Sequence, residues 1–136
     1  MKLKYVHLCD HAFQSEGGKL NFIGIFKNIN IRKFPGGLPK FSLVCGLEIP
    51  STISGKLKLE TIFTGPYEKK IKANIPTLSG ILPKRKKGVI LEFGFNIEII
   101  NFKFKIKGKY KFLVKFNGKD VGKITFDVLQ SPQEKK

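Results

Sequence analysis

The sequence predicts an all-β protein, a single antiparallel two-sheet sandwich of immunoglobulin-like or C2-like outline with about seven to nine strands. Three observations support this fold class. Apolar and polar residues alternate over several stretches, as in strands with one buried face. Turns containing glycine or proline separate these stretches, and no segment combines a helical period with capping residues. A closed barrel is the alternative arrangement.

The length and composition fit one domain. The chain has 136 residues, 41% of them hydrophobic, which is enough for a single core. We assign the sandwich to residues 1–130 and a polar tail to residues 131–136. No apolar run approaches the ~18 residues that span a bilayer, so we expect no transmembrane segment. Two cysteines are too few for a secreted disulfide framework, and we expect free, buried thiols and a cytoplasmic location.

The first two predicted strands form an N-terminal hairpin. Lys2–Phe13 is apolar on both faces, which places it inside a sheet, and Leu20–Ile31 returns after a polar turn. Gly24, within the second strand, indicates a bulge or a close backbone approach. The segment Lys33–Pro39, rich in proline and glycine, then carries the chain to the other sheet.

The middle of the chain continues the strand-and-turn pattern. Phe41–Ile49 and Lys56–Thr64 are predicted strands, and Tyr67–Ile75 is a further short one. Pro76–Gly88 contains two prolines and a basic run, which predicts an irregular loop. Val89–Ile100 alternates again and predicts a core strand.

The strongest alternation lies between Asn101 and Phe116. Even positions from Phe102 onward are apolar, aromatic or glycine, while the odd positions are mostly lysine. This period of two predicts one strand with a buried face and a cationic face. After Asn117-Gly118, a second run places Ile124, Phe126 and Val128 on one face, so the two runs predict a β-hairpin.

The formal net charge is +16, and a field of that sign attracts phosphate backbones and acidic membranes. The candidate anion-binding residues are the lysines of the cationic strand face and a basic run: Lys103, Lys105, Lys107, Lys109, Lys111, Lys84, Arg85, Lys86 and Lys87. A second interpretation is that lysine is abundant because of an AT-rich genome and protects exposed strands from edge pairing. A basic run beside prolines is also typical of a solvated loop.

A zinc site is a further hypothesis. His7, Cys9 and His11 alternate on one predicted strand, and Cys45 could approach from a neighbouring strand to complete a tetrahedral ligand set. The three strand positions span ~13 Å at ~3.3 Å per residue, which is too wide for one ion on a flat strand. The alternative is a packed cysteine with hydrogen-bonded histidines. No nucleophile motif is present, so we expect neither an enzyme nor a cofactor.

Three motifs carry a resemblance to a known family. They are Cys9-Asp10 in the first strand, the GKLN-x-x-GIF pattern at residues 18–26, and a closing hairpin at residues 108–122 with the pattern G-x-Y-x-F-x-V-x-F-N-G-x-x-V-G. Together they resemble a widespread bacterial family of small, uncharacterised β-sandwich proteins. The resemblance implies a β-sandwich and carries no activity.

These observations favour a non-catalytic interaction or assembly module that binds a protein partner or associates with itself. Binding of nucleic acid or of an acidic membrane surface through the lysine-rich strand face is the second hypothesis. A small zinc-binding protein is the third.

Overall fold

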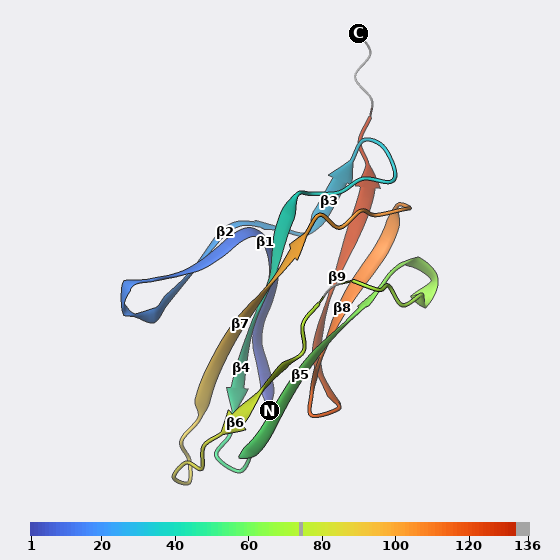
Figure 1. The fold of residues 1–136 in the computed structure, drawn as a ribbon. Coiled ribbons are helices and arrows are strands. Elements are labelled where there is room, and N and C mark those ends of the chain that lie inside the picture. Colours follow the sequence, from blue (N-terminus) through green and yellow to red (C-terminus); the bar gives the residue numbers. More distant parts are fainter. Residues whose placement is uncertain (74, 133–136) are drawn as a thin grey trace.

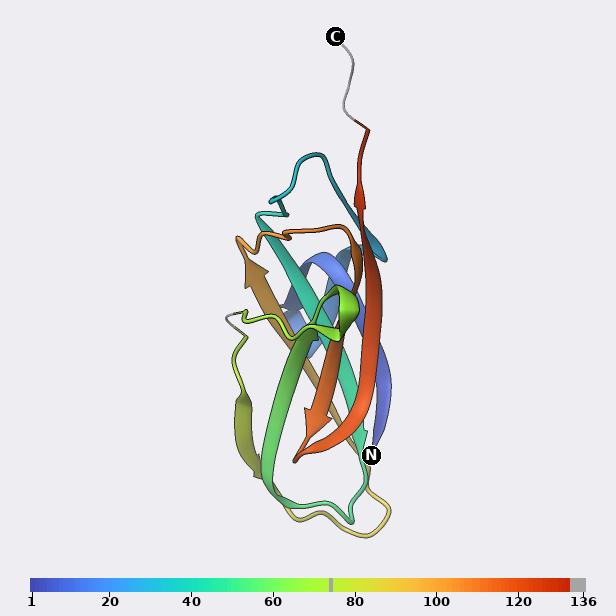
Figure 2. The ribbon, with the colours of Figure 1, turned by 90° about the vertical axis from the view of Figure 1, so that its right-hand side faces the viewer.

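The computed structural model describes residues 1–73 and 75–132, and this part of the chain forms nine strands in two stacked sheets (Figures 1 and 2). The four-stranded sheet has the order β2-β1-β4-β7, with β1 Lys2–Ser15, β2 Lys19–Phe26, β4 Lys40–Ile49 and β7 Leu91–Ile100. The five-stranded sheet has the order β3-β9-β8-β5-β6, with β3 Asn28–Ile31, β5 Gly55–Thr64, β6 Leu78–Leu82, β8 Gly108–Phe116 and β9 Lys119–Gln130. The prediction of a two-sheet β-sandwich is confirmed.

Several individual elements also agree with the sequence pattern. β1 lies inside its sheet between β2 and β4, as its two apolar faces indicate. β8 and β9 form the predicted hairpin around Asn117-Gly118, with Phe126 and Val128 buried. No helix among the described residues is long and apolar enough to cross a membrane. β9 ends at Gln130, and residues 133–136 of the predicted tail lie outside the described residues.

The prediction of one strand over Leu20–Ile31 is wrong, because the chain changes sheets at Lys27. β3 then pairs with β9 in parallel, so the five-stranded sheet is mixed rather than antiparallel. Ile29 and Ile31 face the same core that β1 faces from the other sheet. The alternation therefore continues across the crossing, and periodicity alone does not reveal it.

The prediction of a strand over Tyr67–Ile75 is also wrong. A single 3-10 turn, Pro66–Glu68, occupies its start, and Tyr67 and Glu68 have φ angles of 64° and 58°. Left-handed backbone of this kind cannot continue a strand. The short strand of this region, β6, instead lies within the segment Pro76–Gly88 that was predicted to be irregular.

The long strand predicted from Asn101 begins only at Gly108. Asn101 has a φ of 55°, which ends β7, and residues 102–107 form a loop. Within this loop Phe104 makes an isolated bridge to Gly36, with N–O distances of 2.7 and 3.1 Å. Phe104 is nevertheless fully buried while Lys103 and Lys105 are exposed. Alternation thus predicted the burial of Phe104 although the backbone lacks a ladder there, but Ile106, on the same predicted face, is 48% exposed.

The core between the sheets is dominated by phenylalanine at the end where residues 102–107 cross. The Phe63 ring centroid lies 4.4 Å from that of Phe112 and 5.2 Å from that of Phe102. Phe104 packs edge-on against Tyr110 at 5.0 Å. Each such ring buries a large apolar area, and each aromatic pair contributes a further ~0.5–1.5 kcal/mol through its geometry.

The distal part of the β1–β2 hairpin, residues 9–25, is here called the arm. Its tip extends away from the five-stranded sheet (Figure 1). The Phe22 ring packs 5.6 Å from the Tyr5 ring, and Tyr5 covers Gly46 so closely that a Cβ there would overlap it. Gly24, with a φ of 71°, lies directly against the Asp10 carboxylate, which confirms the predicted close approach.

Replacing Phe63 by alanine should lower the free energy of unfolding by ~3–5 kcal/mol, because it opens a cavity among five other aromatic rings. Urea denaturation measures this change. Ile81→Ala is the control, since that side chain is 82% exposed and its loss should change stability by less than ~0.5 kcal/mol. Equal effects of the two substitutions would contradict the assignment of Phe63 to the core.

Candidate functional site

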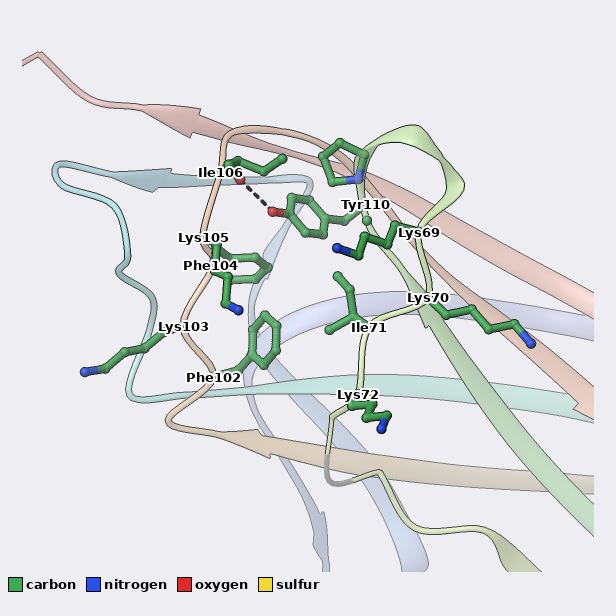
Figure 3. A pocket seen from close by; sticks show the side chains of 12 residues that line it. Lys69, Lys70, Ile71, Lys72, Phe102, Lys103, Phe104, Lys105, Ile106 and Tyr110 are labelled. Carbon is green, nitrogen blue, oxygen red and sulfur yellow. Dashed lines mark hydrogen bonds between the residues drawn. The ribbon is translucent and has the colours of Figure 1, made fainter.

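A pocket of about 430 Å³ opens at the end of the sandwich where two loops meet (Figure 3). One loop follows β5 and the other joins β7 to β8. The lining residues are Gly65, Pro66, Lys69, Lys70, Ile71, Lys72, Phe102, Lys103, Phe104, Lys105, Ile106 and Tyr110. Its volume falls within the ordinary range of small-molecule sites.

The inner part of the pocket is apolar and held by the core. Phe104 and Tyr110 are buried, and Phe102 and Ile71 are half-buried. The Ile71 N–H donates to the Phe63 carbonyl at 2.9 Å, which fixes one wall to β5. The Tyr110 hydroxyl donates to the Ile106 carbonyl, which closes the opposite loop. Burial raises the pKa of Tyr110, so this phenol adds no negative charge at neutral pH.

The rim of the pocket is cationic. Among the described residues that line it, five are lysines and none is acidic. In Figure 3 the Lys69 and Lys105 amines lie beside the apolar groups, whereas Lys70 and Lys103 extend away from them. Lys103 and Lys105 face solvent because Phe104 between them is buried. The nearest acid along the chain, Glu68, pairs with Lys111 at 3.5 Å.

This arrangement suits a ligand that has an apolar or aromatic part beside negative charge. Lysine supplies point charges to such a ligand rather than the paired donors of arginine. Among the described residues that line the pocket there is no histidine, cysteine, carboxylate or serine.

The lysines predicted to form one strand face are divided by the structure. Lys103 and Lys105 line the pocket and Lys107 is exposed on the same loop. Lys109 lies on β8 opposite Asp127, and Lys111 pairs with Glu68. A single cationic strand face is therefore not formed.

Sequence reasoning missed three lysines of the rim. Lys69, Lys70 and Lys72 surround Ile71, directly after the turn that begins at Gly65-Pro66. The signal was present as a cluster of lysines beside a strand break. It could not be used because only the fold brings this loop against residues 102–106.

The second predicted basic group, Lys84–Lys87, is divided as well. Lys84, Lys86 and Lys87 are exposed on the loop after β6. Arg85 turns inward, and its guanidinium donates to the carbonyls of Ile49, Pro50, Ile53 and Pro83 at 2.7–3.3 Å. A guanidinium can reach several carbonyls at once, so Arg85 fastens the β4–β5 turn.

The residues of the zinc hypothesis are not brought together. Cys9 packs with Val44 in one hydrophobic cluster, and Cys45 lies in the main core. The Lys40 amine lies 3.2 Å from Nδ1 of His11. Among the described residues, no group of three or more histidine, cysteine, aspartate or glutamate side chains could hold a metal ion.

The comparison with protein families identifies the chain. A family of unknown function, DUF6941, matches residues 4–129. The chain belongs to this family. No curated protein matches the DUF6941 chain.

Among solved structures, the DUF6941 chain resembles part of the alkylpurine DNA glycosylase AlkC of Pseudomonas fluorescens, bound to DNA containing an abasic site analog. The sequences are 15% identical and the TM-score is 0.45. The match covers 91% of this chain and 30% of the glycosylase chain, and it says nothing about shared activity.

Replacing Arg85 by alanine should lower the free energy of unfolding by ~1.5–3 kcal/mol, because charge-assisted hydrogen bonds to the turn are lost. Lys86→Ala removes an exposed cation from the same loop and is the matched control. Thermal and urea unfolding of both variants measure the difference. If both substitutions left stability unchanged, the structural role of Arg85 would be refuted.

The two cysteines should resist thiol reagents in the folded protein. Burial raises the pKa of Cys9, and it raises the pKa of Cys45 from 9.0 to about 12. Because the thiolate is the reactive form and both side chains are buried, labelling by a chromogenic disulfide reagent should be much slower in buffer than in denaturant. Fast labelling of either thiol in the native state would contradict this expectation.

The same shift predicts a pH dependence of stability. The unfolded Cys45 thiol ionises near pH 9, whereas the folded thiol stays protonated until about pH 12. Its contribution to stability is therefore complete below pH 9 and is lost as the pH rises toward 12. The free energy of unfolding should fall less steeply over this interval in Cys45→Ala than in the wild type.

Proposed function

We propose that this DUF6941 protein is a non-catalytic binding module that receives a single-stranded nucleic acid at the lysine-rimmed pocket. The observation that carries the proposal is the pocket itself, in which five lysines among the described lining residues surround Phe102 and its apolar neighbours. Proteins that bind single strands without sequence preference combine a cationic surface with aromatic side chains on which bases stack.

The surroundings of the pocket support this ligand class. Tyr67 follows the lining residue Pro66 and is 95% exposed, so both faces of its ring are open to a base. Its left-handed backbone, with a φ of 64°, is a conformation that occurs often at functional sites. Phosphates could lie against Lys69 and Lys105 while a base lies against Phe102.

Two other partners fit less well. An acidic membrane is flat, whereas the lysines here surround a hollow. A folded acidic protein would gain little binding affinity from a pocket of this size, because the pocket admits only a small group. We also infer a cytoplasmic setting, because Cys9 and Cys45 are unpaired and buried, as is usual where thiols stay reduced.

The test is anisotropy of a fluorescent oligothymidylate of about 12 nucleotides, titrated at roughly 50–200 mM salt. The variant Lys69→Gln/Lys103→Gln/Lys105→Gln should bind at least ~10-fold more weakly, and its salt slope should fall by ~2, because each lost phosphate contact contributes ~0.7 for single strands. Tyr67→Asn, which tolerates the left-handed backbone, should weaken binding by ~1–3 kcal/mol if the ring stacks on a base.

The matched control removes the same charge from the other end of the sandwich. Lys56 and Lys119 are exposed beside the Asn117-Gly118 turn, and Lys123 is exposed further along β9. Replacement of all three by glutamine should leave binding nearly unchanged. If the two triple variants weakened binding equally, binding would depend on the net charge of the protein and not on the pocket. Preferential binding of acidic-lipid vesicles or of polyglutamate over the oligonucleotide would assign the pocket to another partner.

A further inference from the structure

The arm presents an apolar strip that is separate from the pocket. Ile23 and Ile25 are each 54% exposed, and Phe13 is 42% exposed. Ile23 lies directly opposite His11 in the β1–β2 ladder, and the His11 and Phe13 rings stack with centroids 5.5 Å apart. The strip therefore crosses both strands of the arm. Contiguous exposed apolar side chains mark interaction surfaces.

The strip borders a free sheet edge. β2 is the first strand of its sheet and pairs with β1 alone among the described strands. Natural edge strands usually carry charges along their length, which prevent another strand from pairing with them. β2 has its lysine, Lys19, at the start, and Lys27 follows its end, while Leu20–Phe26 between them contains no charged residue. The middle of this edge is open to an added strand.

The charges near the edge define what could be added. Lys19 and Lys27 are exposed and bracket the exposed isoleucines. The Asp10 carboxylate lies against Gly24. Gly24 is between Ile23 and Ile25 in the strand and so belongs to the opposite face, which places Asp10 off the strip. A segment that matches this edge has apolar residues at alternate positions and acidic residues about eight positions apart.

We propose that β2 receives an extended acidic segment of another protein as an added strand. The backbone of that segment pairs with the free edge of β2, and its apolar side chains continue the strip beside Ile23 and Ile25. Its acidic residues lie near Lys19 and Lys27.

A second copy of this chain is a poor occupant. Antiparallel pairing of two β2 strands about Ile23 sets Lys19 of each copy opposite Lys27 of the other. Parallel pairing in register sets each lysine opposite its own equivalent. Like charges directly opposite are destabilising, and two chains of net charge +16 also repel each other at long range.

The experiment uses the full chain and a synthetic nine-residue peptide, Glu-Thr-Val-Thr-Val-Thr-Val-Thr-Glu, with both ends blocked. Two-dimensional NMR and calorimetry should show binding, with shifts concentrated in the amides of β2. A peptide with lysine in place of both glutamates, and one with proline at the central position, should each bind at least about tenfold more weakly. No binding of the first peptide at about 1 mM would overturn the proposal.

Variants of the protein locate the site. Ile23→Thr/Ile25→Thr keeps strand-forming residues while removing the apolar strip, and it should weaken peptide binding at least about tenfold. Lys69→Gln/Lys103→Gln/Lys105→Gln should leave peptide binding unchanged, which separates this proposal from that for the pocket. Unchanged binding by the isoleucine variant, or amide shifts centred on the pocket, would overturn it. A dimer in sedimentation that the isoleucine variant abolishes would instead assign the edge to a second copy.

Discussion

Burial of Phe104 between the two sheets is the contact on which the functional end of the molecule depends. The ring is fully buried and packs against Phe41, Phe63, Tyr110 and Phe126. Its backbone pairs with Gly36, so the loop after β7 is tied to the loop after β3. A loop without regular pairing is normally mobile. Here one aromatic anchor fixes it, and the lysines on either side of Phe104 are held at the rim of a pocket.

The distribution of acidic residues leaves the lysines of the two pocket loops without acids in the same loop segments. Over the sheets, lysines have carboxylate neighbours, as in Lys4–Glu92 at 2.8 Å and Lys115–Asp120 at 3.6 Å. Exposed pairs of this kind contribute little to stability, but they cancel charge locally. Residues 101–107 contain no acid, and neither do residues 69–73. The two loops that form the pocket therefore combine their fields without local cancellation.

The sequence predicted the sandwich because burial on one face imposes a period of two, as in β8 and β9. It could not predict where the chain changes sheets, because Ile23 and Ile31 lie in the same phase of the alternation, although Ile23 is exposed and Ile31 is buried. It could not locate the pocket either. The alternation predicted that Phe102 faces inward and Lys105 faces solvent. Their proximity to Ile71 depends on tertiary packing between distant loops, which the sequence pattern does not reveal. The role of Arg85 could not be predicted for a related reason, since three of its four carbonyl partners lie 32–36 residues earlier in the chain.

The lysines of the pocket rim and the exposed isoleucines of the arm share a physical property, which is that neither group belongs to the buried core. Clustered lysines repel one another, and exposed isoleucines on an open edge carry a risk of aggregation. A sandwich selected for stability alone would place acids among Lys69, Lys103 and Lys105, and a charge at Ile25. Like-charge repulsion lowers the stability of the free protein, and the open edge promotes aggregation. These effects are offset only when a bound partner neutralises the lysines or covers the isoleucines. The polyanion proposed for the pocket and the acidic segment proposed for β2 both meet that condition.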